Sequence, residues 1–258
     1  MQLLAPEIVE RFYTFLWPML RISALMIAAP IFSLPAFNLR LRVLTAMVLA
    51  WLVYPLHDWP VIDPTSAAGL LEIFNQLAIG LMAGLILQIV VATLVVAGQT
   101  LAASVGLSMA NMIDANMGNV PVISQFLIVL ASLVFVGAGG HAILLGLILE
   151  SFHTLPVGTS ILSQDSYGLI VRWSSMMFLG AVLVALPVMV ALLFINVGLG
   201  VVTRAAPSLN IFAVGFPAML LAGFLLLWLA MGSIVGRMEW LWLQGFDVVR
   251  QLLGVQSG

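Results

Sequence analysis

Charged side chains are scarce in this chain of 258 residues, and two residue types are missing from it. Only 7% of the residues are charged, cysteine and lysine are absent, and all eight basic residues are arginine. The absence of cysteine excludes disulfides, thiolate metal sites and cysteine nucleophiles. The formal net charge is −2 and there is no basic stripe, so we expect no nucleic-acid partner.

Long stretches contain no charged side chain at all, among them residues 73–113, 173–203 and 205–236. A bilayer core about 30 Å thick is crossed by roughly 20 apolar helical residues, and each stretch exceeds that length. Soluble domains need charge at their surface and are about 45–50% hydrophobic. This chain is 63% hydrophobic with a mean hydropathy of +1.22. The sequence therefore predicts an integral membrane protein.

We expect an all-α fold with about six hydrophobic helical segments in one membrane-embedded domain covering residues 1–258. The segments are residues 12–37, 43–56, 73–105, 122–149, 173–203 and 211–236. Proline removes a backbone hydrogen bond and kinks a helix, which predicts breaks at Pro18, Pro30, Pro35, Pro187, Pro207 and Pro217. The glycine-rich residues 137–140 predict a further kink. Because freed backbone groups at membrane depth must be covered by protein or water, a bundle of kinked hairpins is expected.

The arginines do not set the orientation of the chain in the membrane. With the N-terminus outside, the positive-inside rule compares three arginines inside with four outside. These are Arg40, Arg42 and Arg204 against Arg11, Arg172, Arg237 and Arg250. We interpret this balance as a sign that partners fix the final position. The N-terminus has no basic region of a signal peptide, so we expect the first helix to remain.

Small and polar residues lie within the apolar segments. Glycines recur at helical spacing at Gly80, Gly84, Gly98, Gly106, Gly232 and Gly236, which lets another helix approach closely. That helix belongs either to this chain or to another subunit. Intramembrane polar groups are costly unless paired, and they are therefore expected to face the protein interior or a pore. They are Arg21, Asn75, Gln76, Gln88, Gln99 and Asn196. For each of them a clamp between helices is favoured over a transport site.

Enzyme signatures are absent from the sequence: there is no H-E-x-x-H, G-x-S-x-G or Walker motif. Glu150 and His153 have the Glu-x-x-His spacing of di-iron ligands, but the second copy that such a site requires is missing. Structural roles are favoured for His141 and His153. We therefore expect no enzymatic activity, no cofactor and no metal site.

Two segments are more polar than their neighbours. Residues 106–121 are punctuated by Met109, Met112 and Met117, whose flexible side chains can seal an irregular gap and pack again after something passes. An ordinary loop between helices is the alternative. Residues 237–258 predict an amphipathic C-terminal tail, suited to a membrane interface or a partner groove.

Several runs of residues resemble the FliR family of flagellar export-gate proteins. They are Gly106-Leu107-Ser108, Asp114 and Pro121, Gly140-His141, residues 151–158 (SFHTLPVG), residues 185–188 (ALPV) and residues 204–217 (RAAPSLNIFAVGFP). The similarity covers nearly the whole chain in the same order. Residues 152–158 and 207–217 carry its most specific motifs.

The resemblance implies a place in the type III export gate, through which unfolded flagellar subunits leave the cytoplasm. Such a protein assembles with FliP-type and FliQ-type subunits into a helical ring, beside an FlhB-type protein, in the inner membrane within the flagellar basal body. Contacts with membrane lipids are expected, and the ring is displaced toward the periplasm.

The resemblance also implies that the segment 106–121 lies inside the ring and plugs the closed gate. Met109, Met112, Ile113 and Met117 become the expected plug side chains. Asn111, Asp114, Asn116 and Asn119 would offer the polar contacts that hold or release it. Two alternatives remain: the equivalent subunit of a virulence injectisome, and a secondary transporter of a small solute, which usually shows internal repeats.

Overall fold

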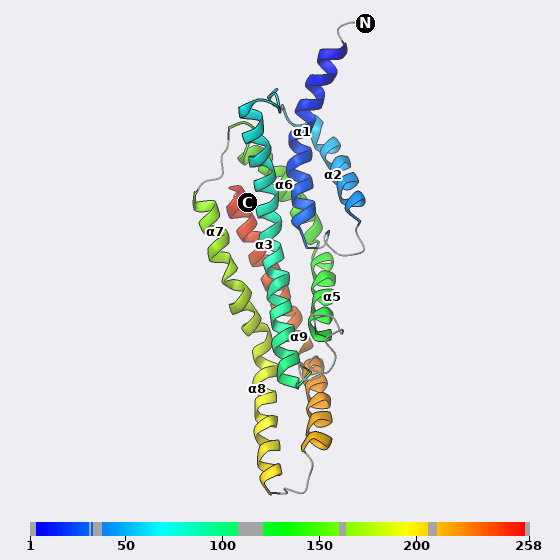
Figure 1. Cartoon of the computed structure of the whole chain (residues 1–258), viewed down its shortest axis with the longest axis vertical. Coiled ribbons are helices and arrows are strands. Elements are labelled where there is room, and N and C mark those ends of the chain that lie inside the picture. The colour runs from blue at the N-terminus through cyan, green and yellow to red at the C-terminus, as the bar shows by residue number, and fades with distance from the viewer. Residues whose placement is uncertain are drawn as a thin grey trace. The chain divides into compact units, whose positions relative to one another are not determined.

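The computed structural model describes residues 4–30, 32, 38–107, 121–159, 164–205 and 211–255 (Figure 1). All regular structure in these ranges is helical, which confirms the all-α fold. The α-helices are α1 (Leu4–Ala28), α2 (Leu39–Val53), α3 (Ala67–Val105), α5 (Val122–Gly137), α6 (Gly140–Thr154), α7 (Gln164–Ser174), α8 (Met176–Ala205) and α9 (Ile211–Leu253). A short 3-10 helix, η1 (Tyr54–Leu56), follows α2.

Four helical stretches are long and apolar enough to cross a membrane: Leu39–Leu56, Ala67–Val105, Asp165–Ala205 and Gly215–Leu253. The pair α5 and α6 makes a fifth if it counts as one bent span. The two helices meet at 65°, and Gly139 between them has a left-handed backbone (φ 70°). Glycine adopts this conformation without the steric cost that a Cβ atom imposes. The predicted kink at residues 137–140 is thus confirmed.

The prolines interrupt fewer helices than the sequence predicts. Pro18, Pro187 and Pro217 lie inside α1, α8 and α9, which continue through them. A proline removes one hydrogen bond, and the intact turns on either side preserve the helix. Pro30 lies in the turn after α1. Pro35 and Pro207 lie outside the described residues.

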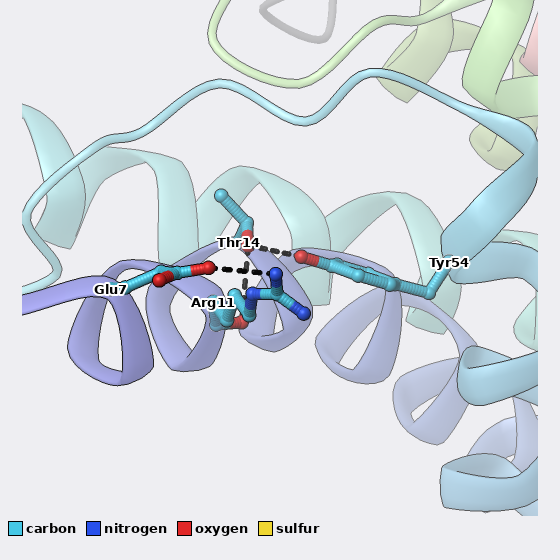
Figure 2. Close-up of polar contacts among 4 residues, drawn as sticks. All are labelled: Glu7, Arg11, Thr14 and Tyr54. Carbon is cyan, nitrogen blue, oxygen red and sulfur yellow. Dashed lines mark hydrogen bonds and ion pairs between the residues drawn. The ribbon is translucent and has the colours of Figure 1, made fainter. Parts of the chain in front are cut away.

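The chain forms two compact units, which are described separately. The first contains α1, α2, the start of α3, α6, α7 and the end of α9, and comprises residues 1–89, 139–174 and 243–258. In it, α1 and α2 lie side by side (Figure 1). Figure 2 shows a polar contact between α1 and η1, at the end of α2, where the hydroxyls of Thr14 and Tyr54 lie 2.7 Å apart. The neighbouring Glu7–Arg11 ion pair is 2.8 Å long but exposed, so it contributes little.

Two glycines of α3 allow α1 to pack against it at backbone distance. A Cβ atom on Gly84 would lie 2.5 Å from the Cβ of Ala28, and one on Gly80 would collide with the carbonyl oxygen of Arg21. For this pair of glycines, the helix that approaches belongs to the same chain.

The substitution Gly84→Ala is therefore expected to destabilise the first unit by about 1–3 kcal/mol, as overpacking does. Gly146→Ala is the matched control, because Gly146 in α6 has no neighbour within 4 Å of its added Cβ. That control should be neutral or stabilising by about 0.5–1 kcal/mol. Thermal unfolding of the purified protein in detergent measures both changes, and equal effects would contradict the packing argument.

The second unit comprises residues 90–138 and 175–242, with the end of α3, α5, α8 and most of α9. A Cβ added to Gly98 would lie only 2.4 Å from Cα of Ser124, so α3 and α5 pack closely here. The hydroxyl of Ser124 donates to the carbonyl of Val95 in α3 (3.0 Å). The indole of Trp242 donates to the carbonyl of Ala131 (3.2 Å) and meets Phe135 edge to face. The second unit therefore has a core of its own.

The C-terminal residues prolong α9 to Leu253 as one helix of 43 residues. The apolar side chains that the sequence assigns to the amphipathic tail are buried within the chain: Met238, Leu241, Trp242, Val248, Val249 and Leu252. Gly232 and Gly236 of the same helix are exposed, and an added Cβ would meet nothing within 4 Å.

Candidate functional site

A fully buried arginine lies at the centre of the first unit. Arg21 of α1 donates through Nη1 to the carbonyl and hydroxyl oxygens of Ser151, at 2.8 and 2.9 Å. Its Nη2 donates to the carbonyl of Leu155, at 2.7 Å. Leu155 is the C-cap of α6, so the guanidinium meets carbonyl groups in the last turn of that helix. A cation is favourable there because the C-terminal end of a helix carries partial negative charge.

The third nitrogen of Arg21 connects α1 to α3. Its Nε donates to Oε1 of Gln76 at 2.7 Å, and Nε2 of Gln76 donates to Oε1 of Glu72. Asn75 donates to the other carboxylate oxygen at 3.5 Å. Glu72, Asn75 and Gln76 are all at most 5% exposed. Gln76 therefore links a buried cation to a buried anion through its amide.

The ring of Phe152 covers the guanidinium from one side, with its centroid 4.3 Å from Cζ of Arg21. Such a contact contributes about 0.5–2 kcal/mol, more when water is excluded. The guanidinium of Arg21 thus joins α1, α3 and α6, and each of its three nitrogens donates a hydrogen bond. We interpret the network as a clamp, because its polar atoms point at one another rather than into a cavity.

Aromatic rings extend the network toward the loop after α2. The rings of His57 and His153 lie 4.4 Å apart between centroids, and both belong to a cluster with Trp59 and Phe152. Burial lowers the pKa of His57, with His153 and Arg21 acting in the same direction and the Val53 backbone and Glu150 opposing them. Neutral His57 is therefore favoured in the folded protein.

The lowered pKa of His57 predicts a pH-dependent stability. Unfolded chains bind more protons than the folded protein as the pH falls below about 6.5, so stability decreases there. His57→Gln should reduce the drop in the unfolding midpoint between about pH 7.5 and pH 5.5. The exposed His141 provides the control, and His141→Gln should leave the drop unchanged. An identical drop in wild type and His57→Gln would contradict this account.

The eight predicted plug residues, Met109, Asn111, Met112, Ile113, Asp114, Asn116, Met117 and Asn119, lie outside the described residues. The structure describes the two ends of their segment. At the first, Gly106 has a φ of 89° and Leu107 N–H donates to the carbonyl of Ala102, which closes the end of α3. At the second, Pro121 is the N-cap of α5.

A groove of about 440 Å³ borders the first of these ends. It is lined by Ala103, Ser104, Val105, Gly106, Asn196, Leu199, Gly200, Gly215, Phe216 and Met219. Asn196 contributes an exposed amide in the uncharged stretch of α8. The sequence predicts that Asn196 faces the protein interior or a pore, but it does not predict this groove, because the lining residues come from three separate segments.

No group of three or more metal-ligating side chains occurs among the residues that the structure describes. Glu150 and His153 share α6 and both are exposed. The arrangement defines a helical membrane protein with several candidate spans, an internal polar clamp and a groove at the base of a long connecting segment.

Comparisons with known proteins give the family. The family model described as "Bacterial export proteins, family 1" matches residues 12–245 of this chain. The chain is 33% identical over 243 residues to "Flagellar biosynthetic protein FliR" of Pectobacterium carotovorum subsp. carotovorum, covering 93% of this chain and 92% of the relative. It is 32% identical to the protein of that name from Escherichia coli (strain K12), with the same coverage. The protein of that name from Bacillus subtilis (strain 168) is 29% identical, covering 96% of this chain and 98% of the relative. The chain therefore belongs to the family of bacterial export proteins, family 1.

Proposed function

We propose that the chain is a membrane subunit of the flagellar protein-export gate, through which unfolded flagellar proteins pass the inner membrane. The observation that carries the proposal is the match of residues 12–245 to the export family, together with relatives named for flagellar biosynthesis that align over nearly their full length. At least four apolar helices agree with a place in the membrane.

The subunit acts within an assembly of FliP-type and FliQ-type proteins beside an FlhB-type protein, in the basal body and displaced toward the periplasm. The open face of α9 at Gly232 and Gly236 supports docking to another subunit, because spacing of four places both glycines on one helix face. The Arg21 clamp holds α1, α3 and α6 in a fixed arrangement within the subunit. A ring needs such rigid parts around its moving gate.

The gate itself is the segment of residues 106–121. Apolar side chains close a pore by excluding water, and methionine can pack again after a substrate passes. The groove beside Gly106 supports this mechanism, since it offers apolar walls and the Asn196 amide at the point where the segment begins. A few kcal/mol between closed and open states suffice for gating.

Secretion in a strain lacking the gene tests the proposed function. Wild-type chain should restore export of flagellin to the medium and swimming, whereas an empty vector should restore neither. Restored membrane insertion without flagellin export would contradict the proposal. The relatives named above give no support to a secondary transporter or an injectisome subunit, and solute uptake by vesicles containing the isolated chain would be required to revive the transporter.

A further inference from the structure

Two grooves of the second unit meet at the side chains of Ser104 and Asn196. The groove of about 440 Å³ beside Gly106 and another of about 260 Å³ both have these two residues in their lining. Together the grooves, here called the Asn196 groove, follow α8 from Leu186 to Gly200 beside the end of α3 (Figure 1). Fourteen helical steps of 1.5 Å make this path about 20 Å long, which is the length of about six residues of extended chain.

The walls of the Asn196 groove carry no charge. Its lining residues lie in the stretches 73–113, 173–203 and 205–236, and none of these stretches contains a charged side chain. The Ser104 hydroxyl donates to the carbonyl of Thr100 (2.8 Å), and its oxygen can still accept. The exposed amide of Asn196 offers one acceptor and two donors. The groove thus combines apolar walls with hydrogen-bonding groups that are neutral.

We propose that the Asn196 groove binds the backbone of the unfolded polypeptide during export. The inference rests on the proposed function, which supplies an unfolded chain as the substrate and places the gate segment next to this groove. An unfolded chain exposes a peptide N–H and C=O at nearly every residue, and one carboxamide can pair with both groups. Because peptide groups are the same in every sequence, such a groove accepts many different exported proteins.

An extended chain fits the groove better than the other apolar molecules of a membrane. A helix of a neighbouring subunit has its backbone groups bonded internally, so its apolar face would leave the Asn196 amide unpaired. An acyl chain of a lipid offers no hydrogen-bonding group at all. Covering a polar group without a partner costs free energy, and the peptide groups of an extended chain avoid that cost.

Disulfide crosslinking to a stalled substrate tests the contact, because the chain has no cysteine of its own. The reporter is an export substrate with single cysteines and a folded C-terminal domain that holds it in the assembled gate. Under a mild oxidant, Ser104→Cys and Asn196→Cys should each form a disulfide with the reporter, which requires Cα atoms within about 7 Å.

Ser132→Cys is the matched control for Ser104→Cys. Ser132 in α5 is also half-buried and donates to the carbonyl four residues before it, that of Ile128, but it does not line the groove. It should form no disulfide with the reporter. Equal crosslinking of Ser132→Cys and Ser104→Cys would overturn the proposal. So would disulfides that join the groove positions only to cysteines placed in a neighbouring subunit.

Two glycines of α8 test whether the groove is used during export. Gly200 lines the groove one turn from Asn196, on the same helix face, whereas Gly198 lies outside the lining. An added Cβ meets nothing within 4 Å at either position, so Gly200→Leu and Gly198→Leu should both assemble normally, as native mass spectrometry would show. Gly200→Leu should cover the amide and slow flagellin export at least about fivefold, as a lost hydrogen bond predicts. Gly198→Leu should export at the wild-type rate.

The result separates this inference from the proposed function. Equal export rates in the two glycine variants, with export restored by the wild-type chain, would overturn the groove and leave the function standing. A wild-type chain that restores no export would overturn the function, and this inference with it.

Discussion

Replacing Arg21 by methionine is expected to lower the stability of the protein by on the order of 3–5 kcal/mol, the usual cost of removing one partner of a buried ionic network. The variant would leave Glu72 and Gln76 buried without the guanidinium to which they are linked. It would also leave the carbonyls of Ser151 and Leu155 without this donor, and open the face of Phe152. Thermal unfolding in detergent should show a fall of at least about 6 °C in the midpoint.

Two further variants separate the network from the mere loss of an arginine. Arg11→Met removes an exposed arginine from the same helix, whose ion pair with Glu7 is open to solvent, and should change stability by less than about 1 kcal/mol. Adding Glu72→Gln to Arg21→Met removes the orphaned charge, so the double variant should be more stable than Arg21→Met alone. An Arg21→Met protein as stable as Arg11→Met would show that the network contributes nothing.

Replacing Met109, Met112 and Met117 together by alanine is expected to raise the ion leak of the assembled gate by at least about tenfold. A tenfold change corresponds to about 1.4 kcal/mol lost from the closed state. The physical reason is the removal of three long flexible side chains that exclude water from the closed pore. Conductance of the purified assembly in planar bilayers measures the leak, and shortening residues 109–117 should act in the same direction.

Met47→Ala is the control for that experiment, because Met47 is an exposed methionine of α2, outside the gate segment. It should leave the conductance at the wild-type level. Native mass spectrometry must show a normal assembly for each variant. Unchanged conductance in a normally assembled triple variant would remove the plug from the mechanism.

The helical architecture could be predicted because the bilayer imposes a length on every uncharged run. The stretches 73–113, 173–203 and 205–236 contribute most of α3, α8 and α9 for this reason. The bend between α5 and α6 could also be predicted, since consecutive glycines permit the left-handed backbone of Gly139. Pro18, Pro187 and Pro217 do not end their helices, because one missing hydrogen bond does not terminate a long helix.

The partners of individual side chains could not be predicted. The sequence predicts that Arg21 and Gln76 face either the protein interior or a pore, and both are buried in the interior. It did not reveal that Ser151 and Leu155, more than a hundred positions away, complete the same network. Backbone carbonyls leave no signal in a sequence, and Glu72 stands at the edge of an apolar stretch, where a solvated charge is the ordinary expectation.

The central claim, that this chain is an export-gate subunit, is tested most directly by the native mass of the tagged chain. It would be extracted in mild detergent after co-expression with its FliP-type and FliQ-type neighbours. We predict a single stoichiometric complex that contains one copy of this chain. A stable monomer or homodimer that leaves those neighbours unbound would contradict the account.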